Sequence, residues 1–140
     1  MTALPLSIAR IAAVRDGGRL LRIALWLDAA GSGALGVLGV AAAPLLADLL
    51  GPTTAALRGT GAFLVAYALG LVFLATRATV PRPGAWSVVV LNAAWVLGSV
   101  GAAVAGREEL TVLGTAVVLA QAAAVAFFAD LQWLGLRRAR

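Results

Sequence analysis

Four long apolar runs dominate this sequence and leave it few ways to fold. They cover residues 20–46, 57–76, 85–105 and 110–136, and each reaches the roughly 20 residues with which a helix crosses about 30 Å of hydrocarbon. Of the 140 residues, 62% are hydrophobic and only 12% are charged, about half the charged share of a typical soluble domain. The pattern predicts an all-α integral membrane protein with four transmembrane helices in one antiparallel bundle.

The segments between the runs carry residues that end helices. Pro44 lies near the end of the first run, and Gly51 and Pro52 lie between the first run and the second. The stretch RATVPRPG at residues 77–84 separates the second run from the third. Proline and glycine at these places indicate short turns. We therefore expect a basic N-terminal segment at residues 1–19, a transmembrane domain at residues 20–136 and a basic tail at residues 137–140.

The N-terminal segment permits two interpretations. Its apolar residues recur at helical spacing, at Leu4, Ile8, Ile11 and Val14. This spacing predicts a short cytoplasmic helix lying on the membrane surface, with Ser7 as its N-cap and Gly17–Gly18 as its end. The alternative is a frayed basic tail.

All eleven cationic side chains are arginines, and most of them lie at one end of the expected bundle. Four crossings place both termini on one side, together with nine arginines: Arg10, Arg15, Arg19, Arg22, Arg77, Arg82, Arg137, Arg138 and Arg140. Only Arg58 and Arg107 fall on the other side. The positive-inside rule then predicts a multi-pass protein of a bacterial inner membrane with both termini in the cytoplasm. A cleaved signal peptide fits less well, because the first run is too long and contains Asp28.

The composition excludes several classes of function. The sequence has no cysteine, histidine or lysine, which removes the usual ligands of zinc and haem, the base of a catalytic triad and the amine of a Schiff base. We expect no metal, no cofactor and no enzyme activity, with carboxylate catalysis on lipid as a remote alternative. The net charge of +5 lies at the ends of the apolar runs, so the expected partner is the lipid bilayer and not nucleic acid.

Polar side chains on several runs are expected at one depth, near the cytoplasmic side. Asp28 lies about 10 Å inside the start of its run, and Asn92 and Asp130 enter to a similar depth on the third and fourth runs. The predicted layer has five members: Asp28, Ser32, Tyr67, Asn92 and Asp130.

Two carboxylates at this depth need partners. An ionised one costs roughly 2.5–3.5 kcal/mol on insertion scales, so we expect Asp28 and Asp130 to share a proton or to bond to Asn92. Arg22 and Arg137 could reach inward from the interface. The layer then either binds a proton, a cation or a polar ligand, or fixes helix register through interhelical hydrogen bonds.

The fourth run carries polar side chains on two faces. Gln121 and Gln132 share one face, whereas Asp130 lies about half a turn from Gln121 at 100° per residue. One face points into the chain's own bundle, and the other points at a second protomer, a partner subunit or a lipid headgroup. We therefore expect a homo-oligomer or a complex with other membrane subunits.

Small residues and aromatic residues complete the expected bundle. Because lipid is as apolar as leucine, helices associate through close packing, for which we select Gly36, Gly39, Gly70 and Gly98. Trp26, Trp86 and Trp133 lie near the cytoplasmic ends of their runs and, with Arg22 and Arg137, are expected to anchor the chain at the interface. Trp95, one turn deeper than Asn92, is expected to pack over the polar layer.

Two functions follow from these features. The short loops and the two-faced fourth run favour a structural or accessory subunit that packs in an oligomer or a larger membrane complex. The alternative is a small proton- or cation-coupled transporter or channel that uses Asp28, Asn92 and Asp130.

Overall fold

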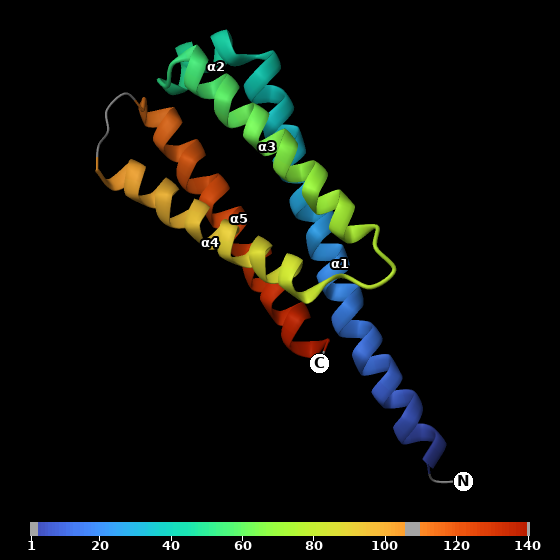
Figure 1. Cartoon of the computed structure of the whole chain (residues 1–140). Coiled ribbons are helices and arrows are strands. Elements are labelled where there is room, and N and C mark those ends of the chain that lie inside the picture. The colour runs from blue at the N-terminus through green and yellow to red at the C-terminus, as the bar shows by residue number, and fades with distance from the viewer. Residues whose placement is uncertain (1–2, 106–109, 140) are drawn as a thin grey trace.

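A computed structural model describes residues 3–105 and 110–139, with side chains described from residue 18 onward. Its helices are α1 (Ala3–Ala41), α2 (Ala43–Leu50), α3 (Thr54–Ala75), α4 (Arg82–Val104) and α5 (Val112–Arg138). Four of them are long and apolar enough to cross a membrane, over Gly18–Ala41, Thr54–Ala75, Arg82–Val104 and Val112–Arg138. The predicted all-α membrane bundle is therefore confirmed, with the short α2 as an addition (Figure 1).

Helix α1 is longer than the predicted first span. Its 39 residues correspond to about 58 Å at 1.5 Å per residue, and its N-terminal part projects beyond the other helices (Figure 1). The expected stop at Gly17–Gly18 does not occur, and Ser7 lies inside the helix. Glycine in a helix costs only about 1 kcal/mol relative to alanine, which is too little to end this one.

The turns use the residues that the sequence provides for them. Pro44 lies in the first turn of α2, where its missing N–H is not needed, and Gly51 ends α2 with a positive φ of 105°. Thr53 and Thr111 cap α3 and α5 by accepting hydrogen bonds from Ala56 (3.1 Å) and Gly114 (2.9 Å).

Helices α1 and α3 form one tightly packed, antiparallel pair. Gly36 and Gly39 on α1 lie against Gly61 on α3, and a Cβ built on Gly61 would lie 2.7 Å from the Gly36 carbonyl oxygen. Backbone therefore meets backbone at this crossing, as small residues permit in membrane helices. Gly70 and Gly98, also predicted to pack, have no atom within 4 Å of such a Cβ and lie on exposed faces of α3 and α4.

Helices α4 and α5 form the second pair, which joins the first mainly along α1 and α5. Gly135 on α5 allows this approach, because a Cβ there would lie 2.7 Å from the backbone nitrogen of Leu21. At the opposite end, the Thr111 hydroxyl donates to the Leu49 carbonyl (2.7 Å), which fastens α2 to the start of α5.

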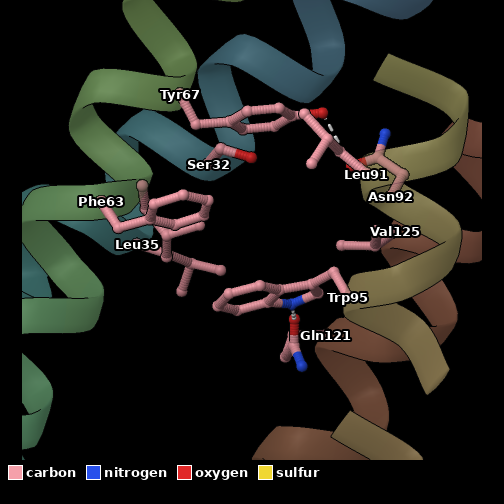
Figure 2. Close-up of a pocket in the computed structure, with 10 residues that line it drawn as sticks. Ser32, Leu35, Phe63, Tyr67, Leu91, Asn92, Trp95, Gln121 and Val125 are labelled. Carbon is pink, nitrogen blue, oxygen red and sulfur yellow. Dashed lines mark hydrogen bonds between the residues drawn. The ribbon is translucent and has the colours of Figure 1, made fainter. Parts of the chain in front are cut away.

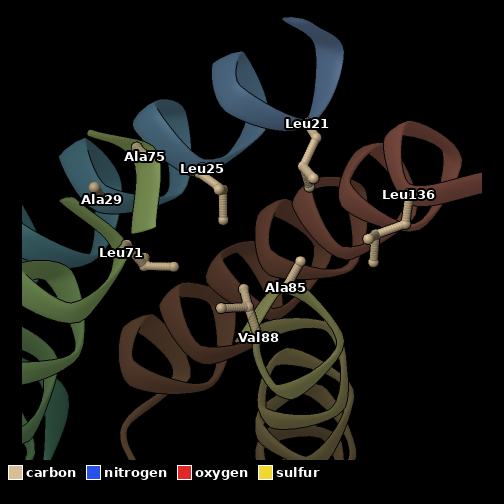
Figure 3. Close-up of a cluster of buried hydrophobic side chains, with 8 residues drawn as sticks. All are labelled: Leu21, Leu25, Ala29, Leu71, Ala75, Ala85, Val88 and Leu136. Atoms are coloured by element: carbon tan, nitrogen blue, oxygen red, sulfur yellow. The ribbon is translucent and has the colours of Figure 1, made fainter. Parts of the chain in front are cut away.

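The end of the bundle that holds Leu21, the loop at residues 76–81 and the end of α5 is called the terminal end here. It is filled by eight apolar residues from all four spans (Figure 3): Leu21, Leu25, Ala29, Leu71, Ala75, Ala85, Val88 and Leu136. This apolar plug closes the terminal end. Toward α2, by contrast, α3 and α4 diverge (Figure 1).

Candidate functional site

Asp28 on α1 lies at the centre of a hydrogen-bonded group of polar side chains. It is fully buried, and its carboxylate oxygens accept hydrogen bonds from the amide nitrogens of Asn92 (2.7 Å) and Gln132 (2.8 Å) and from the Ser32 hydroxyl (3.1 Å). The Tyr67 hydroxyl lies 3.4 Å from Oδ2 of the same carboxylate. These five residues are called the Asp28 cluster.

Every membrane-spanning helix contributes to the Asp28 cluster. Ser32 lies one turn after Asp28 on α1, Tyr67 comes from α3, Asn92 from α4 and Gln132 from α5. Polar contacts of this kind fix the register of helices whose surroundings are apolar. The cluster therefore ties the α1–α3 pair to the α4–α5 pair.

Donors and acceptors within the cluster match closely. Asn92 donates through Nδ2 to Asp28 and to the Gln132 carbonyl oxygen (3.0 Å), and its Oδ1 accepts from the Tyr67 hydroxyl (2.8 Å). Since Tyr67 has one hydroxyl proton, the shorter bond assigns that proton to Asn92. No buried polar side-chain atom in the described part of the chain lacks a partner.

The partners of Asp28 in this cluster are all neutral. Two amides, a hydroxyl and a phenol surround it, so only dipoles offset the charge of an ionised carboxylate. Arg22, which is long enough to reach inward from the interface, instead donates to carbonyl oxygens of Ala75, Arg77 (2.8 Å) and Ala78 (3.2 Å). It thereby satisfies the last carbonyl of α3 and two carbonyls of the loop that follows.

Asp130 lies outside the cluster, which corrects the predicted polar layer. Asp130 is exposed, whereas Gln132 is fully buried. Residues two positions apart in a helix are separated by about 200° around its axis. The side chains of Asp130 and Gln132 therefore leave α5 on opposite sides. A proton shared between Asp28 and Asp130 is therefore excluded by the geometry, and Gln132 occupies the place that the sequence analysis gave to Asp130.

Gln121 makes a second polar contact further from the terminal end. The Trp95 indole nitrogen donates to its carbonyl oxygen (2.8 Å), and the Gln121 amide nitrogen donates to the Ser99 hydroxyl (3.0 Å) and the Val118 carbonyl (2.9 Å). Gln121 and Gln132 thus face the bundle interior together, as their separation of eleven residues requires. The predicted second polar face of α5 is its inner face.

A cavity of about 50 Å³ lies directly beside the Asp28 cluster. Ser32, Tyr67 and Asn92 line it (Figure 2), so three of the four partners of Asp28 contact this space while Asp28 lies one side chain behind. A water molecule needs roughly 10–15 Å³ of such volume, so the cavity has room for a few.

Aromatic rings form the other walls of the cavity. The ring of Phe63 is parallel to that of Tyr67 within 9° and to that of Trp95 within 8°, with centroids 6.3 Å and 6.0 Å apart. Figure 2 shows the Tyr67 and Trp95 rings on opposite sides of the space, with their faces turned toward it.

The cavity continues into a groove between α3 and α4. This groove has a volume of about 700 Å³ and shares Phe63, Leu91, Trp95 and Gln121 with the cavity. Its remaining walls are mostly apolar and lead toward the α2 end: Thr60, Ala94, Gly98, Ser99, Ala102 and Val118. The volume lies in the range of roughly 300–1,000 Å³ that small-molecule sites occupy. No signal in the sequence marked Phe63 or this groove.

The predicted interfacial residues lie on the outside of the bundle. Trp26, Trp86 and Trp133 are exposed, and the Arg137 guanidinium lies 4.7 Å from the centre of the Trp133 ring. This geometry allows a cation–π contact at the terminal end.

The described residues contain no group of three or more acidic side chains placed to hold a metal ion. The chain matches no protein family, no curated protein and no solved structure. The Asp28 cluster and the groove beside it are therefore the candidate functional site.

Proposed function

We propose that this small membrane protein is a proton-coupled transporter of a bacterial inner membrane in which Asp28 is the coupling carboxyl group. One observation carries the proposal: a fully buried carboxylate, held by neutral groups alone, lies between two helix pairs and beside an open groove between α3 and α4. Ionisable groups at membrane depth are costly and mark ion and substrate pathways.

The Asp28 cluster accommodates both protonation states of its carboxyl group. In the ionised state the carboxylate accepts from Ser32, Asn92 and Gln132. Because the Tyr67 proton goes to Asn92, the Tyr67 oxygen can accept from a protonated Asp28. Tyr67 is the other titratable side chain among the described residues that contact Asp28.

The two ends of the bundle differ in how closely their helices are packed, as is expected for one state of a carrier. The apolar plug closes the terminal end, whereas the groove leads from the cavity toward α2. The sequence has nine arginines on the side expected to hold both termini and two on the other, so the positive-inside rule favours a cytoplasmic location for both termini. The groove then faces the outer side of the membrane.

The hydrogen bonds that link the two helix pairs at Asp28 suggest how access to the cluster could alternate between the two sides of the membrane. Gain or loss of a proton on Asp28 changes hydrogen bonds that link α1 to α4 and α5. Rocking of one pair against the other would open the terminal end and close the groove, as rigid-body movement does in larger carriers.

The test is proton movement in proteoliposomes that contain a trapped pH-sensitive dye. We expect wild-type protein to move protons in exchange for a cation supplied as an imposed gradient of potassium, sodium, a small organic amine or an aromatic organic cation, and Asp28→Asn to abolish this flux. Asp130→Asn is the matched control and should transport normally, because Asp130 is exposed. Equal flux in wild type and Asp28→Asn would refute the proposal.

A second function, that of an accessory subunit in an oligomer or a larger complex, is favoured by a different observation. Asp130 is exposed on the outer face of a membrane-spanning helix, where lipid offers a carboxylate no partner. Exposed small residues on α4, at Ala94, Gly98 and Ala102, would let another helix approach closely. Native mass spectrometry after gentle detergent extraction should then detect an oligomer or a foreign subunit that Asp130→Leu releases. A lone chain would argue against this function.

A further inference from the structure

We infer that the space between Tyr67 and Trp95 binds a flat, aromatic, singly charged organic cation that enters through the groove between α3 and α4. The inference rests on the proposed function and names the class of substrate. It is carried by the shape of the cavity, the chemistry of its walls and the position of Asp28 behind them.

The shape of the cavity suits a planar ring. Tyr67 and Trp95 lie on opposite sides of it, and both rings are nearly parallel to Phe63 (Figure 2). A flat molecule that enters this space parallel to the three rings presents its own faces to them. The cavity alone, at about 50 Å³, is too small for such a molecule, but the adjoining groove of about 700 Å³ holds the rest.

The chemistry of the walls favours positive charge. The faces of Phe63, Tyr67 and Trp95 carry negative electrostatic potential, which attracts cations within about 6 Å of a ring centre. The residues that line the cavity and the groove include no arginine, so no wall repels a cation or attracts an anion.

Asp28 lies where cation binding in the cavity and protonation of its carboxylate affect each other. Its carboxylate lies behind Ser32, Tyr67 and Asn92, which line the cavity. A cation bound there stabilises the ionised carboxylate, because opposite charges attract strongly where water is excluded. A bound cation and a proton on Asp28 therefore oppose each other, so that a proton entering from the other side displaces the cation.

The groove also gives the ligand a route. It opens between α3 and α4, whose outward residues face lipid, and its apolar walls suit a molecule that first partitions into the membrane. The small residues Ala94, Gly98 and Ala102 keep this route wide.

Ethidium, a fluorescent planar aromatic cation, is the probe for the first test. We expect saturable binding to the purified protein, with its neutral parent ring phenanthridine at least about tenfold weaker. Trp95→Ala and Asp28→Asn should each weaken ethidium binding about tenfold or more, and Trp133→Ala, which removes an exposed tryptophan, should leave it unchanged. Equal binding by all four proteins would mean partition into detergent and would overturn the inference.

A conservative variant guards against loss of folding. Trp95→Phe keeps an aromatic face but removes the indole donor to Gln121, and it should retain most of the binding if helicity by circular dichroism is unchanged. Loss of binding in a folded Trp95→Phe protein would contradict the role of the ring.

Proton release in weakly buffered solution separates the two proposals. Ethidium should release protons from wild-type protein and from Trp133→Ala but not from Asp28→Asn. If ethidium fails to bind while Asp28-dependent proton flux persists in proteoliposomes, the substrate class is wrong and the transporter proposal stands. If both fail, both proposals are refuted.

Discussion

Replacement of Gly61 by alanine should separate the two most tightly packed helices. A Cβ at Gly61 would lie 2.7 Å from the Gly36 carbonyl oxygen, 2.8 Å from the Val40 nitrogen and 2.9 Å from the Gly39 carbonyl carbon. Contacts below 3.0 Å are not tolerated, and ordinary contact begins near 3.4 Å. All three atoms belong to the backbone of α1, so α1 and α3 must move apart by about 0.7 Å.

The expected loss is about 1–3 kcal/mol of unfolding free energy, as for other overpacked sites, because the separation weakens contacts along the whole α1–α3 crossing. Gly70→Ala on the same helix is the matched control. It meets no atom within 4 Å and should be neutral or slightly stabilising, because alanine favours helix.

Both variants can be compared by equilibrium unfolding in mixed micelles, with loss of helical circular dichroism as the signal. A Gly61→Ala protein as stable as wild type, or a Gly70→Ala protein equally destabilised, would refute the packing derived for this pair.

Three further changes test other parts of the structure. Arg22→Ala should lower the unfolding free energy by about 1.5–3 kcal/mol, because carbonyls at and just after the end of α3 lose their donor. Thermal unfolding checks this, with replacement of the exposed Arg19 by alanine as the control. Gln132→Leu should cost about 1–3 kcal/mol by removing a donor to Asp28, whereas Asp130→Asn, which removes an exposed carboxylate, should not lower the unfolding free energy. Similar losses in both would contradict the assignment of Gln132 to the cluster. Gly114→Ala should destabilise the contact with Leu50, where a Cβ would overlap the Leu50 carbonyl, while Gly101→Ala, which meets nothing, should unfold like wild type in the same assay.

The membrane architecture could be predicted from sequence because it depends on composition over about 20 residues at a time. The spans of α3, α4 and α5 begin and end within a few residues of the predicted runs. The break between α1 and α2 also follows a sequence signal, since Pro44 cannot continue α1 unaltered. Continuity of α1 through Gly17–Gly18 was not predicted, because glycine weakens a helix without ending it.

The polar layer was predictable in depth but only partly in direction. Asp28, Asn92 and Tyr67 meet as expected, because residues at equal depth on neighbouring helices can reach one another. Depth alone selected Asp130, whereas helical periodicity places Gln132 and Gln121 on one face and Asp130 on the other. Helical periodicity therefore distinguishes Gln132 from Asp130, whereas depth in the membrane does not.

Close packing could not be assigned from rows of small residues alone. In a chain rich in alanine and glycine, such rows occur on every face, and the row that contains Gly70 is exposed. Gly61 packs because Gly36 and Gly39 oppose it, which only the tertiary arrangement determines. The groove between α3 and α4 depends on the same arrangement.

The most direct test of the account is whether the Asp28 carboxyl group gains and loses a proton within the membrane. Infrared difference spectra of the reconstituted protein, recorded between acidic and alkaline pH, resolve the carbonyl stretch of a protonated carboxyl group. The account predicts a pH-dependent band that disappears in Asp28→Asn and persists in Asp130→Asn. Spectra in which Asp28→Asn is indistinguishable from wild type would contradict it and leave the Asp28 cluster as a fixed link between helices.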